Sequence, residues 1–77
     1  MLLEHDRIVL TANIPEEGLE AGDVGVIVHI HPQHAAYEVE FFSLDGNTVT
    51  VATVMAEQAR AVTNQDVTHA RIIRAAV

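Results

Sequence analysis

The chain of 77 residues contains no cysteine, no lysine and no tryptophan. Without cysteine it has no disulfides, no thiolate zinc sites and no cysteine nucleophile, and this composition fits a reducing cytoplasm. Eleven Asp and Glu residues outnumber four arginines, so the formal net charge is −7. Because affinity for nucleic acids rests largely on Lys and Arg displacing counterions, we expect no nucleic-acid partner. An acidic chain instead favours a basic protein or a cation.

Long apolar segments are also missing. The first acidic residue is Glu4, which leaves no apolar stretch of the ~7–15 residues that a signal peptide requires. No other run approaches the ~20 apolar residues that span a bilayer. A soluble, cytoplasmic protein without membrane contact is therefore expected. Its length suits one domain with a modest core.

Apolar residues alternate with polar ones along most of the chain, which is typical of half-buried strands. This alternation predicts five strands, over residues 7–11, 24–31, 37–42, 48–54 and 59–62. Asp45-Gly46 predicts a type I′ hairpin turn, and residues 55–58 predict one helical or 3₁₀ turn. The pattern indicates an all-β fold, a small closed five-stranded SH3-like barrel over residues 1–62. A five-stranded OB-fold is the alternative.

The second strand is the clearest of the five. We expect one face to point into the barrel and the other to point outward. The inward residues would be Val24, Val26, Val28 and Ile30, and the outward residues Gly25, Ile27, His29 and His31. Gly25 inside a β-branched run indicates a bulge or a sharp bend.

Two segments flank this sheet pattern. In the loop of residues 12–23, Pro15 and Gly18 suit a turn, while Ile14 and Leu19 are expected to anchor the loop to the barrel. Residues 63–77 begin with Thr63 and an acidic residue three positions later, as in a capping box, and apolar residues then recur at helical spacing. They predict a short C-terminal helix, with a disordered or strand-like tail as the alternative.

Residues 14–28, Ile-Pro-Glu-Glu-Gly-Leu-Glu-Ala-Gly-Asp-Val-Gly-Val-Ile-Val, together with Tyr37-Glu-Val-Glu-Phe41 and Asp45-Gly46, carry a resemblance. Over residues 3–62 the chain resembles a family of short bacterial proteins of unknown function with SH3-like, KOW-like barrels. The resemblance implies a fold and no activity. KOW modules imply RNA binding through basic residues, and this chain has almost none.

Histidine is the only residue type whose positions suggest a metal. His29 and His31 share one strand face, and His34 follows just beyond the bend. Imidazoles bind zinc, copper or nickel, so a weak site is possible with outward-facing Glu38 or Glu40. The alternatives are solvent-facing His–Glu pairs or a pH-sensitive surface. No other cofactor is expected.

Catalytic groups are not expected. Ser43 is the only serine and lacks the Gly-x-Ser-x-Gly elbow of a nucleophile. The loop of residues 12–23 is acidic. Acid–base catalysis by its carboxyl groups would need a concave pocket that separates their pKa values, and a small barrel filled with side chains offers none.

We expect a protein-binding module, such as an accessory or regulatory subunit or an antitoxin-like protein, that contacts a partner or a second copy. The candidate contact residues are Glu16, Glu17, Glu20, Ile27 and Phe42. Alternatively, Phe42 packs under the C-terminal helix.

Overall fold

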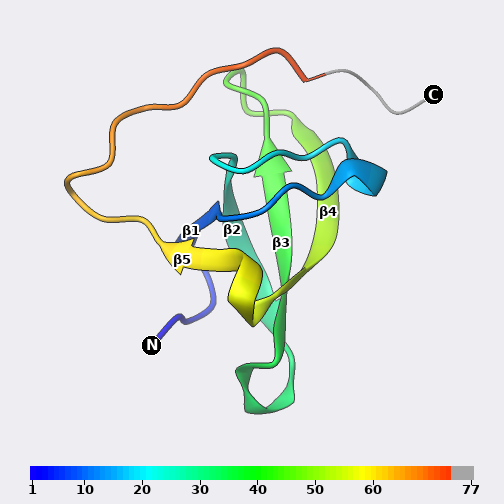
Figure 1. The fold of residues 1–77 in the computed structure, drawn as a ribbon, viewed down its shortest axis with the longest axis vertical. Coiled ribbons are helices and arrows are strands. Elements are labelled where there is room, and N and C mark those ends of the chain that lie inside the picture. Colours follow the sequence, from blue (N-terminus) through cyan, green and yellow to red (C-terminus); the bar gives the residue numbers. More distant parts are fainter. Residues whose placement is uncertain (74–77) are drawn as a thin grey trace.

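The computed structural model describes residues 1–73, and residues 74–77 lie outside the description. Five antiparallel strands form one sheet in the order β4-β3-β2-β1-β5 (Figure 1). The strands are β1 (Arg7–Leu10), β2 (Val24–Ile30), β3 (Ala36–Phe42), β4 (Thr48–Met55) and β5 (Ala59–Ala61). Three short 3₁₀ turns connect them: η1 (Pro15–Glu17), η2 (Pro32–His34) and η3 (Ala56–Gln58). The predicted all-β class and its five strands are confirmed.

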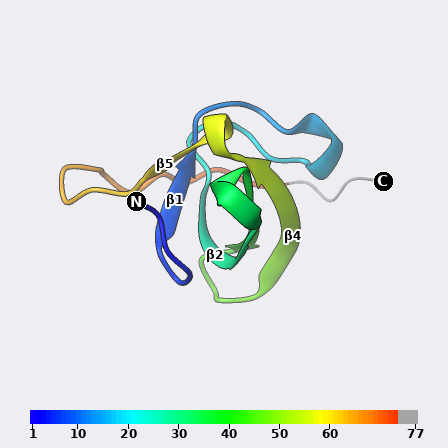
Figure 2. The ribbon, with the colours of Figure 1, turned by 90° about the horizontal axis from the view of Figure 1, so that it is seen from below.

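The core lies on the concave side of the curled sheet, which Figure 2 shows nearly end-on. Alternate residues of each strand point to this side because successive side chains of a strand face opposite ways. Two residues of the first loop complete the cluster. The buried cluster contains Ile8, Leu10, Ile14, Leu19, Ile27, Tyr37, Val39, Phe41, Ala52 and Val54. Within residues 1–73, no helix is long and apolar enough to cross a membrane.

The predicted closure of the barrel is not observed. β4 and β5 are the two end strands of the sheet, and they are joined by η3 without pairing to each other. At this corner the Thr11 amide donates to the Gln58 carbonyl at 2.8 Å, so η3 contacts the first loop. The sheet is thus curled but open, and no strand pairs with the outer edge of β4.

The predicted orientation of β2 is wrong for its first half. Ile27, expected on the surface, is 0% exposed, whereas Val24 and Val28 are about two-fifths exposed. A Cβ on Gly25 would lie 2.5 Å from Val39 Cγ1, so the missing side chain lets β3 pack closely there. The register between β2 and β3 is regular at Gly25, where the irregularity was predicted, and it shifts further along the strand, between Ile27 and His29. Alternation alone could not choose the face, because both faces of β2 carry β-branched residues.

The hairpin between β3 and β4 also differs from its prediction. A type I′ turn needs positive φ at both central residues, but here Gly46 has a φ of 89° and Asp45 is not in that region. The Gly46 amide donates to the Ser43 carbonyl, and the Ser43 amide donates to the Asn47 carbonyl, both at 2.9 Å. The connection is therefore a longer loop with Gly46 in the left-handed conformation.

The predicted C-terminal helix is not formed in residues 63–73, which run as an extended tail, and its last part lies outside the described residues. The predicted capping contacts do occur: Asp66 Oδ2 accepts from the Thr63 amide at 2.8 Å. Arg60 also binds this carboxylate, through two nitrogens at 2.7 and 3.0 Å. A helix this short is marginal by itself, and tertiary contacts further along the tail favour the extended form.

Candidate functional site

The first loop is a rigid projection that carries three exposed carboxylates. Its base is a small β-bridge between buried Ile14 and Leu19, whose amides and carbonyls pair at 2.9 and 3.1 Å. Pro15 starts η1, and Gly18 ends it with a φ of 72°, as the turn chemistry predicts. The predicted contact residues Glu16, Glu17 and Glu20 all point to solvent.

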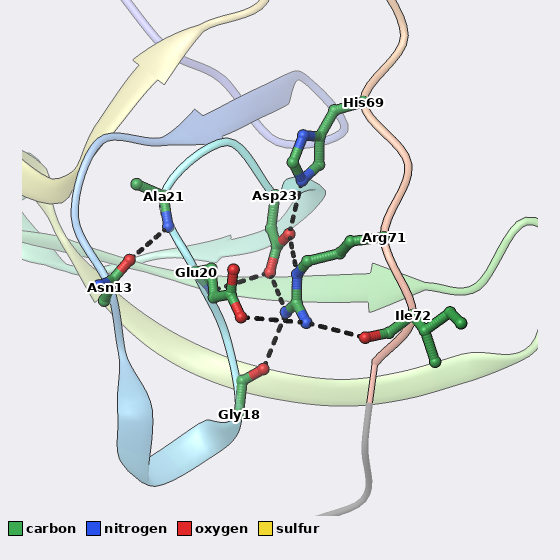
Figure 3. A network of polar contacts seen from close by, with 8 residues as sticks. All are labelled: Asn13, Gly18, Glu20, Ala21, Asp23, His69, Arg71 and Ile72. Atoms are coloured by element: carbon green, nitrogen blue, oxygen red, sulfur yellow. Dashed lines mark hydrogen bonds and ion pairs between the residues drawn. The ribbon is translucent and has the colours of Figure 1, made fainter.

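Asp23, at the end of this loop, is a buried charged residue, 9% exposed. Figure 3 shows Arg71 of the tail reaching this carboxylate with two parallel bonds. Arg71 Nε donates to Asp23 Oδ1 at 2.8 Å, and an Arg71 terminal nitrogen donates to Oδ2 at 2.6 Å. The same nitrogen donates to the Gly18 carbonyl at 2.8 Å. We call the contacts of Arg71 and His69 with Asp23 and Gly18 the clasp.

The electrostatics of the clasp favour an ionised Asp23. Burial by itself raises the pKa of this carboxyl, but bonds from Arg71 and from the Glu20 amide outweigh burial, so the net pKa lies below its usual value. The Asp23 carboxylate raises the pKa of Arg71 in return. Glu20 adds a longer contact to the guanidinium, at 3.6 Å. The pair is charged over the whole ordinary pH range.

His69 completes the clasp beside a glycine. Its Nε2 lies 3.2 Å from Asp23 Oδ1. Gly22 has a φ of 97°, and a Cβ there would lie 3.3 Å from His69 Cε1. Gly22 is therefore required both by its backbone conformation and by the imidazole packed against it.

The sequence interpretation missed the clasp. Asp23 falls in the predicted loop of residues 12–23, and Arg71 falls in the predicted helix of residues 63–77. No spacing signal links the two, because they are 48 residues apart.

A groove of about 430 Å³ lies between the tail and the β3–β4 hairpin. Its floor includes Leu19 and Phe41 of the core, and the clasp forms one end. Phe42, one of the predicted contact residues, is 43% exposed at its wall, and neighbouring Leu44 is 86% exposed. The alternative prediction, Phe42 under a C-terminal helix, is wrong because residues 63–73 form no helix.

The acidic loop borders this groove. Leu19 and Asp23 belong to both the loop and the groove lining. Thr50 of β4 donates through its hydroxyl to Glu17 Oε1 at 3.2 Å, which holds η1 against β4. The structure therefore brings Glu16, Glu17, Glu20 and Phe42 to one side of the molecule, whereas Ile27 is buried in the core.

The three candidate metal-binding histidines point to different partners. His31 Nε2 lies 2.6 Å from Glu38 Oε2, and its ring packs edge-on against His29. His34 packs edge-on against Tyr37 instead. Within residues 1–73, no group of three or more His, Asp or Glu side chains could hold a metal ion. The predicted three-histidine metal site is not assembled in this part of the chain.

These features define a small all-β domain with an acidic first loop, an apolar groove and a tail fastened by a buried ion pair. The family model described as a domain of unknown function, DUF4926, matches residues 4–61, and the chain belongs to this family. Searches of curated proteins and of solved structures returned no match. The clasp residues His69 and Arg71 lie outside the matched residues.

Proposed function

We propose that this protein is a non-enzymatic protein-binding module that docks on a basic surface of a partner protein. The observation that carries the proposal is that exposed Glu16 and Glu17 lie in the loop that contributes Leu19 and Asp23 to a groove. Exposed Phe42 and Leu44 also line this groove. Protein interfaces commonly combine an apolar centre with a polar rim. Large aromatic side chains near the centre contribute most of the binding energy.

Rigidity of the acidic loop supports the same proposal. The Ile14–Leu19 bridge fixes the base of the loop, and the clasp fixes its end. A surface held in its binding conformation loses little conformational entropy on association. The net charge of −7 would also steer a basic partner toward it.

We infer further that the fold is SH3-like and that the setting is bacterial and cytoplasmic. A long first loop, two hairpins and a 3₁₀ turn before the last strand support the SH3-like assignment. The resemblance over residues 3–62 supports a bacterial origin, and the lack of cysteine supports a reducing compartment. A small accessory subunit and an antitoxin-like protein both fit such a module.

The experiment captures partners from the native cell extract on the tethered protein and then measures association of the purified partner by surface plasmon resonance. We expect the on-rate to fall as salt rises. Glu17→Gln should lower the on-rate, whereas Glu4→Gln, an exposed acid in the N-terminal segment, should leave it unchanged. Phe42→Ala should raise the off-rate by about tenfold. An on-rate indifferent to ionic strength and to Glu17→Gln contradicts the proposal.

A second candidate, a proton-responsive surface, is favoured by one contact. The hydrogen bond from His31 lowers the pKa of Glu38, and the Thr53 hydroxyl lowers it further. Partner affinity that responds to protons through this contact would lose its pH dependence in His31→Gln, because the variant lacks the imidazole that contacts Glu38. His5→Gln serves as the control. Equal pH dependence in both variants excludes this candidate.

A further inference from the structure

The exposed edge of β4 is unusual for the outer strand of a sheet. Natural edge strands are kept short, or carry a charge, a proline or a bulge that discourages pairing with another chain. The eight residues of β4, Thr-Val-Thr-Val-Ala-Thr-Val-Met, contain no charge, no proline and no glycine. Val51 and Met55 on its outer face are almost half exposed.

The backbone of β4 shows which groups face outward. In an antiparallel pair, hydrogen-bonded residues alternate along each strand. The Ala56 amide donates to the Ala35 carbonyl at 3.2 Å, in the same register as the rest of the β3–β4 pair. Counting back from Ala56, the amides and carbonyls of Thr53 and Val51 must point away from β3. We call these groups the β4 edge.

The far end of the strand agrees with this assignment. The amide of Met55, which is also directed away from β3, donates to the Gln58 side-chain oxygen at 2.9 Å. In residues 1–73 no comparable partner is present for the amides of Val51 and Thr53. The chain thus caps the last outward amide of β4 and leaves the middle of the strand open.

Charges surround the β4 edge on both sides. Glu17 is hydrogen-bonded to Thr50 at one end, beside exposed Glu16. At the other end, exposed Glu57 follows the strand in η3. An uncharged strand between acidic groups complements an apolar segment with basic residues at its ends. A second copy of this chain would instead bring two sets of these carboxylates together.

We propose that the β4 edge binds an extended segment of the partner protein as a sixth strand, and that this segment carries alternating β-branched residues between basic ends. The inference rests on the proposed protein-binding function and specifies its mode. Main-chain hydrogen bonds to Val51 and Thr53 supply affinity in such strand addition, and neighbouring side chains supply specificity. Pairing at this position also gives hydrogen-bond partners to the outward amides and carbonyls of Val51 and Thr53.

The test uses a synthetic peptide of alternating Val and Thr with lysines at both ends, and a matched peptide with glutamates at both ends. Amide hydrogen exchange of the full chain is followed by NMR. At a lysine-peptide concentration about ten times its Kd, we expect exchange of the Val51 and Thr53 amides to slow by about tenfold. The glutamate peptide should leave these amides unprotected.

Two substitutions at one position separate strand addition from other contacts. Val51→Pro removes an amide that β3 does not use, as edge strands tolerate, and it should abolish the protection. Val51→Thr keeps the amide and should retain the protection. If Val51→Pro does not fold, a lysine peptide N-methylated at alternate residues provides the same test on the wild-type chain, and it should not protect the amides.

Three outcomes overturn the inference. Peptide binding that protects no β4 amide, with equal affinity for Val51→Pro, rejects strand addition while protein binding through the groove and the acidic loop stands. Protection that grows with protein concentration alone identifies a second copy as the occupant. If the lysine peptide does not bind, the proposed pairing of β4 with a segment that carries basic ends is wrong. None of these outcomes alters the salt dependence of partner association, which tests the proposed function separately.

Discussion

Two regions of this small domain differ in how their polar groups are satisfied. Where the first loop ends, the clasp joins it to the tail, and the buried carboxylate of Asp23 is matched by Arg71. Along the outer edge of the sheet, β4 carries no charge, and the amides of Val51 and Thr53 face outward. The chain thus spends one of its four arginines on fastening its own tail. The comparison shows that a specific contact satisfies the charge at the clasp, whereas the outward amides of Val51 and Thr53 have no comparable partner within residues 1–73.

Removing the cation from the clasp should give the largest loss of stability. Arg71→Ala leaves a carboxylate in a site where burial opposes its charge, and breaking one side of such a pair costs about 3 kcal/mol. Urea unfolding followed by circular dichroism measures the loss. The β4 edge should be unaffected, so lysine-peptide binding by this variant is the control. A stability equal to that of the wild type would mean that the clasp does not hold the tail in solution.

Acid should reduce this difference between wild type and Arg71→Ala. The pKa of Asp23 in the wild type lies below its ordinary value of 3.8, so its contribution is present above that pH and lost as the pH falls through the lower folded value. Without the hydrogen bonds from Arg71, the pKa of Asp23 in the variant is expected to lie above that in the wild type, so acid removes less stability from the variant. The two unfolding free energies, measured in urea at neutral pH and below pH 3.8, should converge on acidification. A constant difference contradicts the ionised pair.

A smaller loss is expected at the glycine beside the clasp. Gly22→Ala forces a side chain into a positive φ and against His69, whereas Gly46→Ala meets the same φ with open space around it. The left-handed conformation costs about 1–2 kcal/mol for a non-glycine residue, so Gly22→Ala should be the more destabilising by the additional crowding. When each substitution is combined with His69→Ala, the losses of stability caused by Gly22→Ala and Gly46→Ala should become similar. Thermal unfolding of all four variants measures this.

The smallest effect is expected at a second arginine–carboxylate pair. Arg60 binds Asp66 through its two terminal nitrogens, and both side chains are more exposed than those of Arg71 and Asp23. Exposed pairs of this kind contribute little to stability. Arg60→Ala should therefore shift the urea midpoint far less than Arg71→Ala does. Equal shifts would show that burial of Asp23 is not what distinguishes the clasp.

Much of the fold could be predicted because strand alternation and turn chemistry are local. The five strands and the anchors Ile14 and Leu19 follow from residues close together in the chain. An irregularity in β2 was also predicted, but it lies between Ile27 and His29 and not at Gly25. The inner face of β2 did not follow, since it depends on how Val39 and Phe41 of β3 pack against Gly25. The prediction of a closed barrel was wrong for a related reason. Whether β4 pairs with β5 depends on how the chain turns at η3, which strand alternation does not determine.

The residues of the candidate site also fall into those that local sequence determines and those that tertiary contacts determine. The exposed acids of the first loop and the exposed Phe42 were predicted, because residue type and strand parity determine them. Asp23 and Arg71 were not, because a buried ion pair forms only when the tail crosses the loop. The tail followed helical spacing in the sequence, but its contacts with Asp23 and the core outweigh the weak propensity of a short helix. Tertiary contacts therefore decided both the tail and the clasp.

Because Asp23 and Arg71 are separated by 48 residues, the ion pair encloses nearly the whole sheet within its loop. The strands can pair through shorter loop closures first, so the tail is expected to join late, after the rate-limiting step. Interactions absent from the transition state lengthen the lifetime of the native state without accelerating its formation. Arg71 would then slow unfolding, so Arg71→Ala should raise the unfolding rate while the folding rate stays the same.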